Sequence, residues 1–153
     1  MKILSGGQTG VDRAALDAAV AKKLPIGGWC PKGGWAEDLP EPPGLLAPYP
    51  QLRETPQAEP GQRTQWNVRD ADRLMVLVDR AGIVVSPGSR AARDFAIRLG
   101  KPHIVLDLDA TDARARARAF LGEGGSSVCI AGPRESEAPG IYAKTRAFLN
   151  AVL

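Results

Sequence analysis

Residues that build metal sites and covalent cross-links are scarce in this sequence. It contains two isolated cysteines, Cys30 and Cys129, and a single histidine, His103. This set excludes the common four-ligand zinc patterns and gives no disulfide framework. We therefore expect no bound metal, no cofactor that the protein itself requires, and a reducing compartment.

Long apolar runs are also missing. No apolar stretch approaches the roughly 20 residues that a membrane-spanning helix needs. The sequence starts with a short apolar run at residues 3–4 and a glycine loop, rather than with the basic segment and apolar core of an export signal. These features predict a soluble, cytoplasmic protein with no membrane partner.

Neither sign of charge dominates. The 20 basic and 17 acidic residues are interspersed and give a net charge of +3, which is not the composition of a polyanion-binding protein. The arginine run at residues 114–118 does not change this, because residues two apart lie about 200° apart on a helix and cannot form one stripe. We expect no nucleic-acid partner.

The sequence does contain a regular alternation of strand-like and helix-like segments. With 153 residues it is predicted to form one domain, residues 1–153, that buries about two-thirds of the surface of the unfolded chain. The main strands are expected at residues 3–4, 25–29, 74–78, 103–107 and 128–131, with helices between them that include residues 62–71 and 91–99. This order predicts an α/β fold with an open, mainly parallel sheet and helices on both faces.

Three segments carry more detailed expectations. Residues 74–78 form a continuous apolar run, typical of a strand covered on both faces, and are predicted at the centre of the sheet. Residues 83–85 follow too closely for a parallel crossover, so they are either a hairpin partner or, as we favour, an extended lead into the next loop. The proline-rich stretch 39–61 predicts an excursion over the surface, with a short edge strand near residues 52–55.

Three loops that precede helices combine glycine with hydroxyl and charged side chains. They follow residues 4, 85 and 130, and the carboxyl ends of parallel strands meet at one rim of a sheet, so the loops are expected to converge there. Glycine turns and unpaired helix N–H groups favour an oxyanion such as phosphate. The first loop taken alone is also explained as a tight turn capped by Thr9 or Asp12. It matches neither the dinucleotide fingerprint nor the phosphate loop that ends in glycine, lysine and serine or threonine.

The residue types in these loops predict the donors of an anion site. Backbone and side-chain donors come from the first loop, side-chain hydroxyls and guanidinium groups from the other two, and a mobile cation from the loop after the second strand. The residues are Gly6, Gly7, Gln8, Thr9 and Gly10; Ser89 and Arg90; Arg134 and Ser136; and Lys32.

Other reactive side chains leave their roles open. The carboxylates near the loops can act as an acid and base pair if they are buried together, but helix ends and solvent explain each of them equally well; they are Asp12, Glu37, Asp70, Asp72 and Glu135. Cys30 is either a thiolate with a pKa lowered by a nearby lysine or a buried structural thiol. The tryptophans Trp29, Trp35 and Trp66 either stack on a flat heterocycle or belong to a core or lid.

Four motifs, spread over nearly the whole chain, occur in a fixed order: SGGQTGVDRAALD at residues 5–17, GWCPKG at 28–33, WNVRDAD at 66–72 and AGPRES at 131–136. Together they resemble the putative molybdenum carrier family. That family is similar to a circularly permuted branch of the superfamily that includes molybdenum-cofactor carrier proteins and cytokinin-activating nucleotide hydrolases. The resemblance implies a Rossmann-like three-layer fold.

The resemblance also implies the residues of the ligand site. The residues from Gly6 to Asp12 and Gly132, Pro133, Arg134, Glu135 and Ser136 would line it, with Lys32, Asn67 and Asp70 beside them. The loop at residues 87–94, which includes Gly88, Ser89 and Arg90, departs from the hydrolase pattern, because it lacks the second glycine, the threonine and a glutamate in register.

This departure argues against hydrolysis, and we predict no catalytic residue. We therefore expect a binding or carrier protein for a phosphate-bearing heterocycle, with the molybdenum cofactor or a nucleotide as ligand. A nucleotide N-glycosidase that uses Asp94, Glu135 or Asp12 is the alternative, and an oligomeric scaffold with an incidental anion site is a third. The sequence leaves the formation of a homo-oligomer open.

Overall fold

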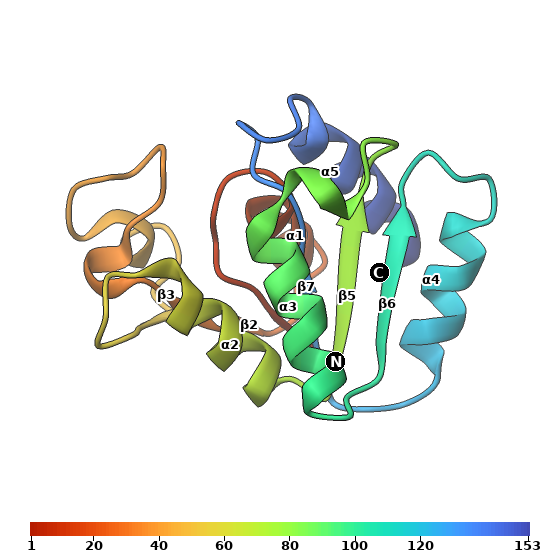
Figure 1. The fold of residues 1–153 in the computed structure, drawn as a ribbon, viewed down its shortest axis with the longest axis horizontal. Coiled ribbons are helices and arrows are strands. Elements are labelled where there is room, and N and C mark those ends of the chain that lie inside the picture. Colours follow the sequence, from red (N-terminus) through yellow and green to blue (C-terminus); the bar gives the residue numbers. More distant parts are fainter.

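The computed structural model describes residues 1–153 and shows an α/β fold in three layers (Figure 1). Its main sheet has five strands in the order β2-β1-β7-β5-β6, and every neighbouring pair is parallel. The strands are β1 (Lys2–Leu4), β2 (Ile26–Gly27), β5 (Arg73–Val78), β6 (His103–Asp107) and β7 (Ser127–Ala131). The helices are α1 (Val11–Ala21), α2 (Pro60–Asp70), α3 (Pro87–Arg98), α4 (Ala113–Gly122) and α5 (Ile141–Val152). The predicted fold class is confirmed.

Helices cover both faces of the sheet. Helices α2 and α3 pack against each other on one face, while α1 and α5 pack on the other and α4 lies beside β6 (Figure 1). The side chains of β5 alternate between two apolar cores: Met75 and Leu77 face the core under α1 and α5, and Leu74 and Val76 face the core under α2 and α3. Burial on both faces explains the continuous apolar run of this strand.

The prediction that residues 74–78 form the sheet centre was wrong. The central strand is β7, and β5 lies between β7 and the edge strand β6. All the residues of β5 are buried, so its composition is that of an interior strand. Strand order depends on pairing between segments far apart in the chain, such as Ile3 with Val128, and apolarity alone does not encode it.

The second predicted strand, residues 25–29, is divided in two at Gly28. Strand β2 stays in the main sheet, whereas β3 (Trp29–Cys30) pairs with β4 (Arg53–Glu54) in a separate two-stranded sheet. Gly28 has φ +127°, and a side chain there would overlap the backbone of Ser5. The bend therefore needs glycine. Strand β4 confirms the short strand expected near residues 52–55.

The segment before α3 also differs from its prediction. Residues Ile83–Val85 form a 3-10 turn and not an extended lead-in, and α3 begins at Pro87. Pro87 suits a first helical position because it has no N–H group to leave unpaired, and the side chain of Ser86 caps the helix by accepting from the amide of Ser89. Gly88, Ser89 and Arg90 thus belong to the first turn of the helix rather than to a loop.

Residues 31–58 project at one end of the molecule (Figure 1) and include most of the excursion predicted at residues 39–61, whose last two residues begin α2. Leu45, Tyr49 and Leu52 anchor it, since their buried side chains join the core that contains Leu16 and Ile130. None of the helices has the length and apolarity that crossing a lipid bilayer requires.

Candidate ligand-binding site

A cleft of about 370 Å³ lies at the carboxyl ends of the central strands. From this rim the chain runs from β1 through α1 to β2 in one direction, and from β5 through α3 to β6 in the other. Such a switch point leaves a crevice between the diverging connections, where ligands of open α/β sheets bind. The rim cleft is lined by Gly6, Gln8 and Asp12; by Glu59, Pro60, Gly61, Arg63, Thr64, Asn67 and Val68; by Ser86, Pro87, Gly88, Ser89, Ala91 and Ala92; and by Cys129, Ile130, Ala131, Gly132, Arg134 and Glu137.

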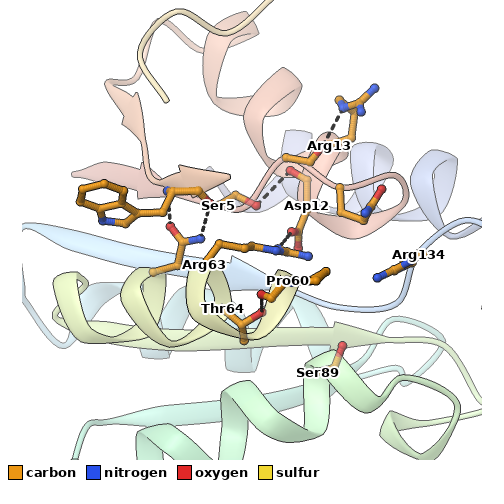
Figure 2. Close-up of polar contacts among 12 residues, drawn as sticks. Ser5, Asp12, Arg13, Pro60, Arg63, Thr64, Ser89 and Arg134 are labelled. Atoms are coloured by element: carbon orange, nitrogen blue, oxygen red, sulfur yellow. Dashed lines mark hydrogen bonds and ion pairs between the residues drawn. The ribbon is translucent and has the colours of Figure 1, made fainter. Parts of the chain in front are cut away.

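The strongest charge contact of the cleft joins α1 to α2. Arg63 Nη1 donates to Asp12 Oδ2 at 2.8 Å (Figure 2), and the two side chains are only 12% and 6% exposed. Arg63 Nε is buried and has no hydrogen-bond partner. A buried donor without a partner is costly, so the guanidinium is not satisfied by Asp12 alone.

Burial changes the acidity of this pair. Desolvation raises the pKa of the Asp12 carboxyl above its ordinary value, and this effect outweighs the charge and hydrogen bond of Arg63 and the backbone of Gln8, which lower it. The ion pair thus only partly offsets the cost of burying the carboxylate.

Gly6 makes room for the ion pair. A methyl group at this position would overlap Arg63 Nη1 and lie 2.9 Å from Asp12 Oδ2. The close approach of the guanidinium, and not a positive φ, therefore favours glycine at this position.

Several backbone amides of the first loop also have no hydrogen-bond acceptor within the protein. The amides of Gly6, Gly7 and Gly10 donate no hydrogen bond within the protein, although all three residues are buried. Buried amides are nearly always paired. Of the three, Gly6 lies beside the buried Arg63 and lines the cleft, so its N–H group and the guanidinium form the surroundings that an oxyanion requires.

The first and third loops touch each other through Gly10. A side chain at Gly10, which has φ +80°, would overlap the carbonyl oxygen of Pro133, and that oxygen accepts from the amide of Val11. The first helical amide of α1 is therefore used inside the protein. Convergence of the loops on one rim is observed, but the start of α1 is not free for a ligand.

Three of the predicted anion donors contact an internal carboxylate. Thr9 Oγ1 and Ser136 Oγ donate to the carboxylate of Glu37, Ser136 at 2.8 Å, and Arg134 Nη1 lies 3.8 Å from Glu37 Oε2. Arg134 also stacks over the Trp35 ring, with its guanidinium carbon 5.7 Å from the ring centre. We call Thr9, Glu37, Arg134 and Ser136 the Glu37 cluster; of its members, only Arg134 also lines the rim cleft.

The surroundings of Glu37 shift its acidity. Partial burial raises the pKa of this carboxyl, but the hydrogen bonds from Thr9 and Ser136 and the charge of Arg134 outweigh it and hold the pKa below its ordinary value. Glu37 is therefore an anion at neutral pH, in contact with the groups that the sequence offers to a ligand.

The structure brings about half of the predicted site residues to the cleft. Those that line it are Gly6, Gln8, Asp12, Asn67, Gly88, Ser89, Gly132 and Arg134. Those that do not are Gly7, Thr9, Gly10, Lys32, Asp70, Arg90, Pro133, Glu135 and Ser136. Lys32 and Asp70 each lie at a different surface hollow, and Arg90 is exposed to solvent on the first turn of α3.

Several polar groups near the cleft serve the fold. Asn67 donates to the carbonyl of Trp29 and accepts from its amide, both at 2.8 Å. These two hydrogen bonds take the place of those that a neighbouring strand would make beside the bend at Gly28. Glu135 accepts from the amides of Gly140 and Tyr142 at the start of α5. These contacts use the donors and acceptors that a ligand would need.

The remaining reactive side chains are explained by packing. Cys30 and Cys129 are both buried, and desolvation raises the pKa of Cys30 to about 11, so Cys30 is a structural thiol and not a thiolate. Trp29 and Trp66 pack edge to face, with ring centres 4.7 Å apart. No tryptophan lines the rim cleft, and no group of three histidine, cysteine, aspartate or glutamate side chains is placed to hold a metal ion.

Arg63 lines the cleft but is absent from the residues that the sequence predicted for the site. It lies four residues before Asn67, which was predicted, and so shares its face of the helix. That spacing was the available signal.

The chain matches the circularly permutated YpsA SLOG family over residues 3–153. It belongs to this family. A crystal structure from Syntrophus aciditrophicus SB, described as a putative molybdenum carrier protein, is 37% identical, with a TM-score of 0.86 over 99% of this chain and 94% of that one. No curated protein matches the chain at a significant level. These comparisons confirm the resemblance found in the four sequence motifs.

Proposed function

We propose that this protein binds and carries a phosphate-bearing heterocycle, either the molybdenum cofactor or a nucleotide, in the rim cleft. The observation that carries the proposal is the buried Arg63 Nε without an acceptor, beside the unpaired amide of Gly6, which also lines the cleft. Each buried unsatisfied donor costs about 1–3 kcal/mol, so an oxyanion that accepts from them would bind favourably. The molybdenum carrier description of the Syntrophus protein supports a carrier role.

The two ends of such a ligand would meet different parts of the cleft. Arg63 and Arg134 offer guanidinium groups to the phosphate, and Gly88 adds the first turn of α3, where the helix dipole favours an anion. Val68 and Ala92 supply apolar wall for the heterocycle. The volume of about 370 Å³ lies within the range of about 300–1,000 Å³ that is usual for small-molecule sites.

No observation favours the N-glycosidase. The carboxylates that line the cleft already accept hydrogen bonds: Glu59 from the amide of Gly61 at 2.6 Å, Glu137 from that of Arg134 at 2.9 Å, and Asp12 from Arg63. Of the other two candidate acids, Glu135 holds the start of α5, and Asp94 pairs with its neighbour Arg93 and does not line the cleft. We therefore do not propose hydrolysis, and it is only one possible outcome of the binding experiment below.

Native mass spectrometry of protein purified without added ligand tests the proposal directly. We expect a mass increment that corresponds to a phosphate-bearing heterocycle and is lost on denaturation. Titration calorimetry with adenosine and guanosine monophosphates and with inorganic phosphate then measures affinity. A bare protein that binds none of these would contradict the proposal. Release of free base from the nucleotides would support the glycosidase.

Arg134→Ala tests the site within the cleft. Loss of one charge-assisted hydrogen bond costs about 1.5–3 kcal/mol, so affinity should fall about tenfold to hundredfold. The matched control is Arg116→Ala on α4, which removes the same charge from an exposed side chain outside the cleft and should change affinity less than twofold. Equal effects of the two variants would refute a specific role for Arg134.

A further inference from the structure

Glu37 occupies the donors that the sequence pattern offers to a ligand. Its carboxylate accepts from Thr9 and Ser136 and faces Arg134. Each of these three side chains comes from a loop at the carboxyl rim of the sheet. An internal carboxylate therefore holds the place of an external anion.

The position of the Glu37 backbone does not depend on its carboxylate. The Glu37 amide donates to Gln8 Oε1 at 3.0 Å, and the preceding Ala36 is fully buried in the core. The following Asp38 accepts a pair of hydrogen bonds from Arg13 at 2.9 and 3.0 Å. The side chain, which is 25% exposed, can therefore turn into solvent by rotation about its own bonds while the segment stays in place.

Arg134 belongs to both sites. Its guanidinium lies beside Glu37 and over Trp35, and the residue also lines the rim cleft (Figure 2). A guanidinium that moves to pair closely with a ligand phosphate weakens its ion pair with Glu37, so the two anions compete for its charge.

We propose that Glu37 is an intramolecular competitor that lowers the affinity of the rim cleft for anions, because it pairs with Arg134, the one member of the Glu37 cluster that also lines the cleft. The proposal rests on the proposed anion-binding function of the cleft. In the free protein the carboxylate lies beside the Arg134 guanidinium, and a phosphate that enters the cleft draws the guanidinium away from it. Binding is weakened by the free energy of the ion pair that Arg134 gives up.

Glu37→Gln tests this with inorganic phosphate and adenosine monophosphate as probes, measured by titration calorimetry. Glutamine keeps the size of the side chain but loses the charge, and charge-assisted hydrogen bonds are roughly twice as strong as neutral ones. We expect both probes to bind about tenfold more tightly, a change of about 1.4 kcal/mol. Asp38→Asn is the matched control, because it removes the same charge from the neighbouring residue, which contacts Arg13 and not the cluster; its affinities should change less than twofold.

The outcomes separate this proposal from the proposed function. If wild type binds the probes and Glu37→Gln binds them equally or more weakly, the competitor role is refuted and the binding function stands. If neither protein binds either probe, both proposals fail. If only Glu37→Gln binds, the competitor role is supported in its strongest form. An equal gain in Asp38→Asn would assign the effect to net charge and refute the role of Glu37.

A second variant covers the case in which glutamine disturbs folding. Glu37→Asp keeps the charge but shortens the side chain by one methylene, which moves the carboxylate away from Arg134 and weakens their ion pair. We expect phosphate affinity to rise severalfold, by less than in Glu37→Gln. An unchanged or lower affinity in a folded Glu37→Asp protein would refute the proposal.

Discussion

Replacement of Gly6 by alanine should destabilise the protein by displacing one side chain. The new methyl group would overlap Arg63 Nη1 and approach Asp12 Oδ2 to 2.9 Å, while the backbone at Gly6 has no positive φ and accepts alanine without strain. The guanidinium must move, and its 2.8 Å contact with Asp12 is lost.

The magnitude follows from the burial of the pair. Both side chains are nearly buried, so solvent screens the contact little. Loss of a hydrogen bond to a charged group costs about 1.5–3 kcal/mol, and we expect the free energy of unfolding to fall by about that amount. For a chain of this size the melting temperature should fall by roughly 3–12 °C.

Urea denaturation of four proteins measures the effect and its cause: wild type, Gly6→Ala, Arg63→Met and the double variant. Where Arg63 has no guanidinium, Gly6→Ala has less to displace, so the two changes should couple by at least about 1 kcal/mol. Gly88→Ala is the control, since a methyl group there meets nothing within 4 Å and should stabilise α3 by about 0.4–1 kcal/mol. A Gly6→Ala cost that is the same with and without Arg63 would refute the reasoning.

Three further variants test contacts outside the ion pair. Asn67→Ala removes both hydrogen bonds to Trp29 and should lower the free energy of unfolding by about 1–3 kcal/mol, with an altered tryptophan emission spectrum; an unchanged urea midpoint would show that the amide is dispensable. Glu135→Ala removes the acceptor at the start of α5 and should cost about 1 kcal/mol in thermal melts followed by circular dichroism, where a melting temperature equal to that of wild type would count against it. Hydrogen bonds from Arg13 hold the pKa of Asp38 below its ordinary value, so the unfolded state binds more protons. This contribution is present above the unfolded pKa of about 3.9 and is lost as the pH falls through the lower folded pKa. Asp38→Asn should therefore lose less stability than wild type between about pH 5 and 2. Urea denaturation at several pH values measures this, and an equal fall in the free energy of unfolding of the two proteins would contradict it.

Local patterns predicted the elements that depend on local physics. The continuous apolar run of β5 and the alternation of strands and helices gave the fold class, because burial on both faces leaves a clear record in composition. The glycine loop after β1 was also predictable from local sequence, because a position such as Gly10, with a positive φ and a close approach to another loop, needs glycine.

Features that depend on distant partners were not predictable in this way. The contact between Arg63 and Asp12 joins residues 51 positions apart; the spacing within α2 places Arg63 on the face of Asn67, but it does not show that a buried carboxylate from α1 pairs with it. Likewise, Thr9 and Ser136 look like free donors in the sequence. Only the folded chain shows that Glu37, from the segment after β3, accepts hydrogen bonds from both of them.

The central position of β7 has a consequence for synthesis of the protein. Strands β1 and β2 form one pair and β5 and β6 another, and these pairs share no hydrogen bonds until β7 inserts between them. The nascent chain therefore carries two incomplete half-sheets until residues 127–131 have left the ribosome. Because β7 also supplies part of the cleft wall, the cleft is complete only after β7 has paired, so a ligand of this cleft would stabilise the finished protein rather than the separate strand pairs.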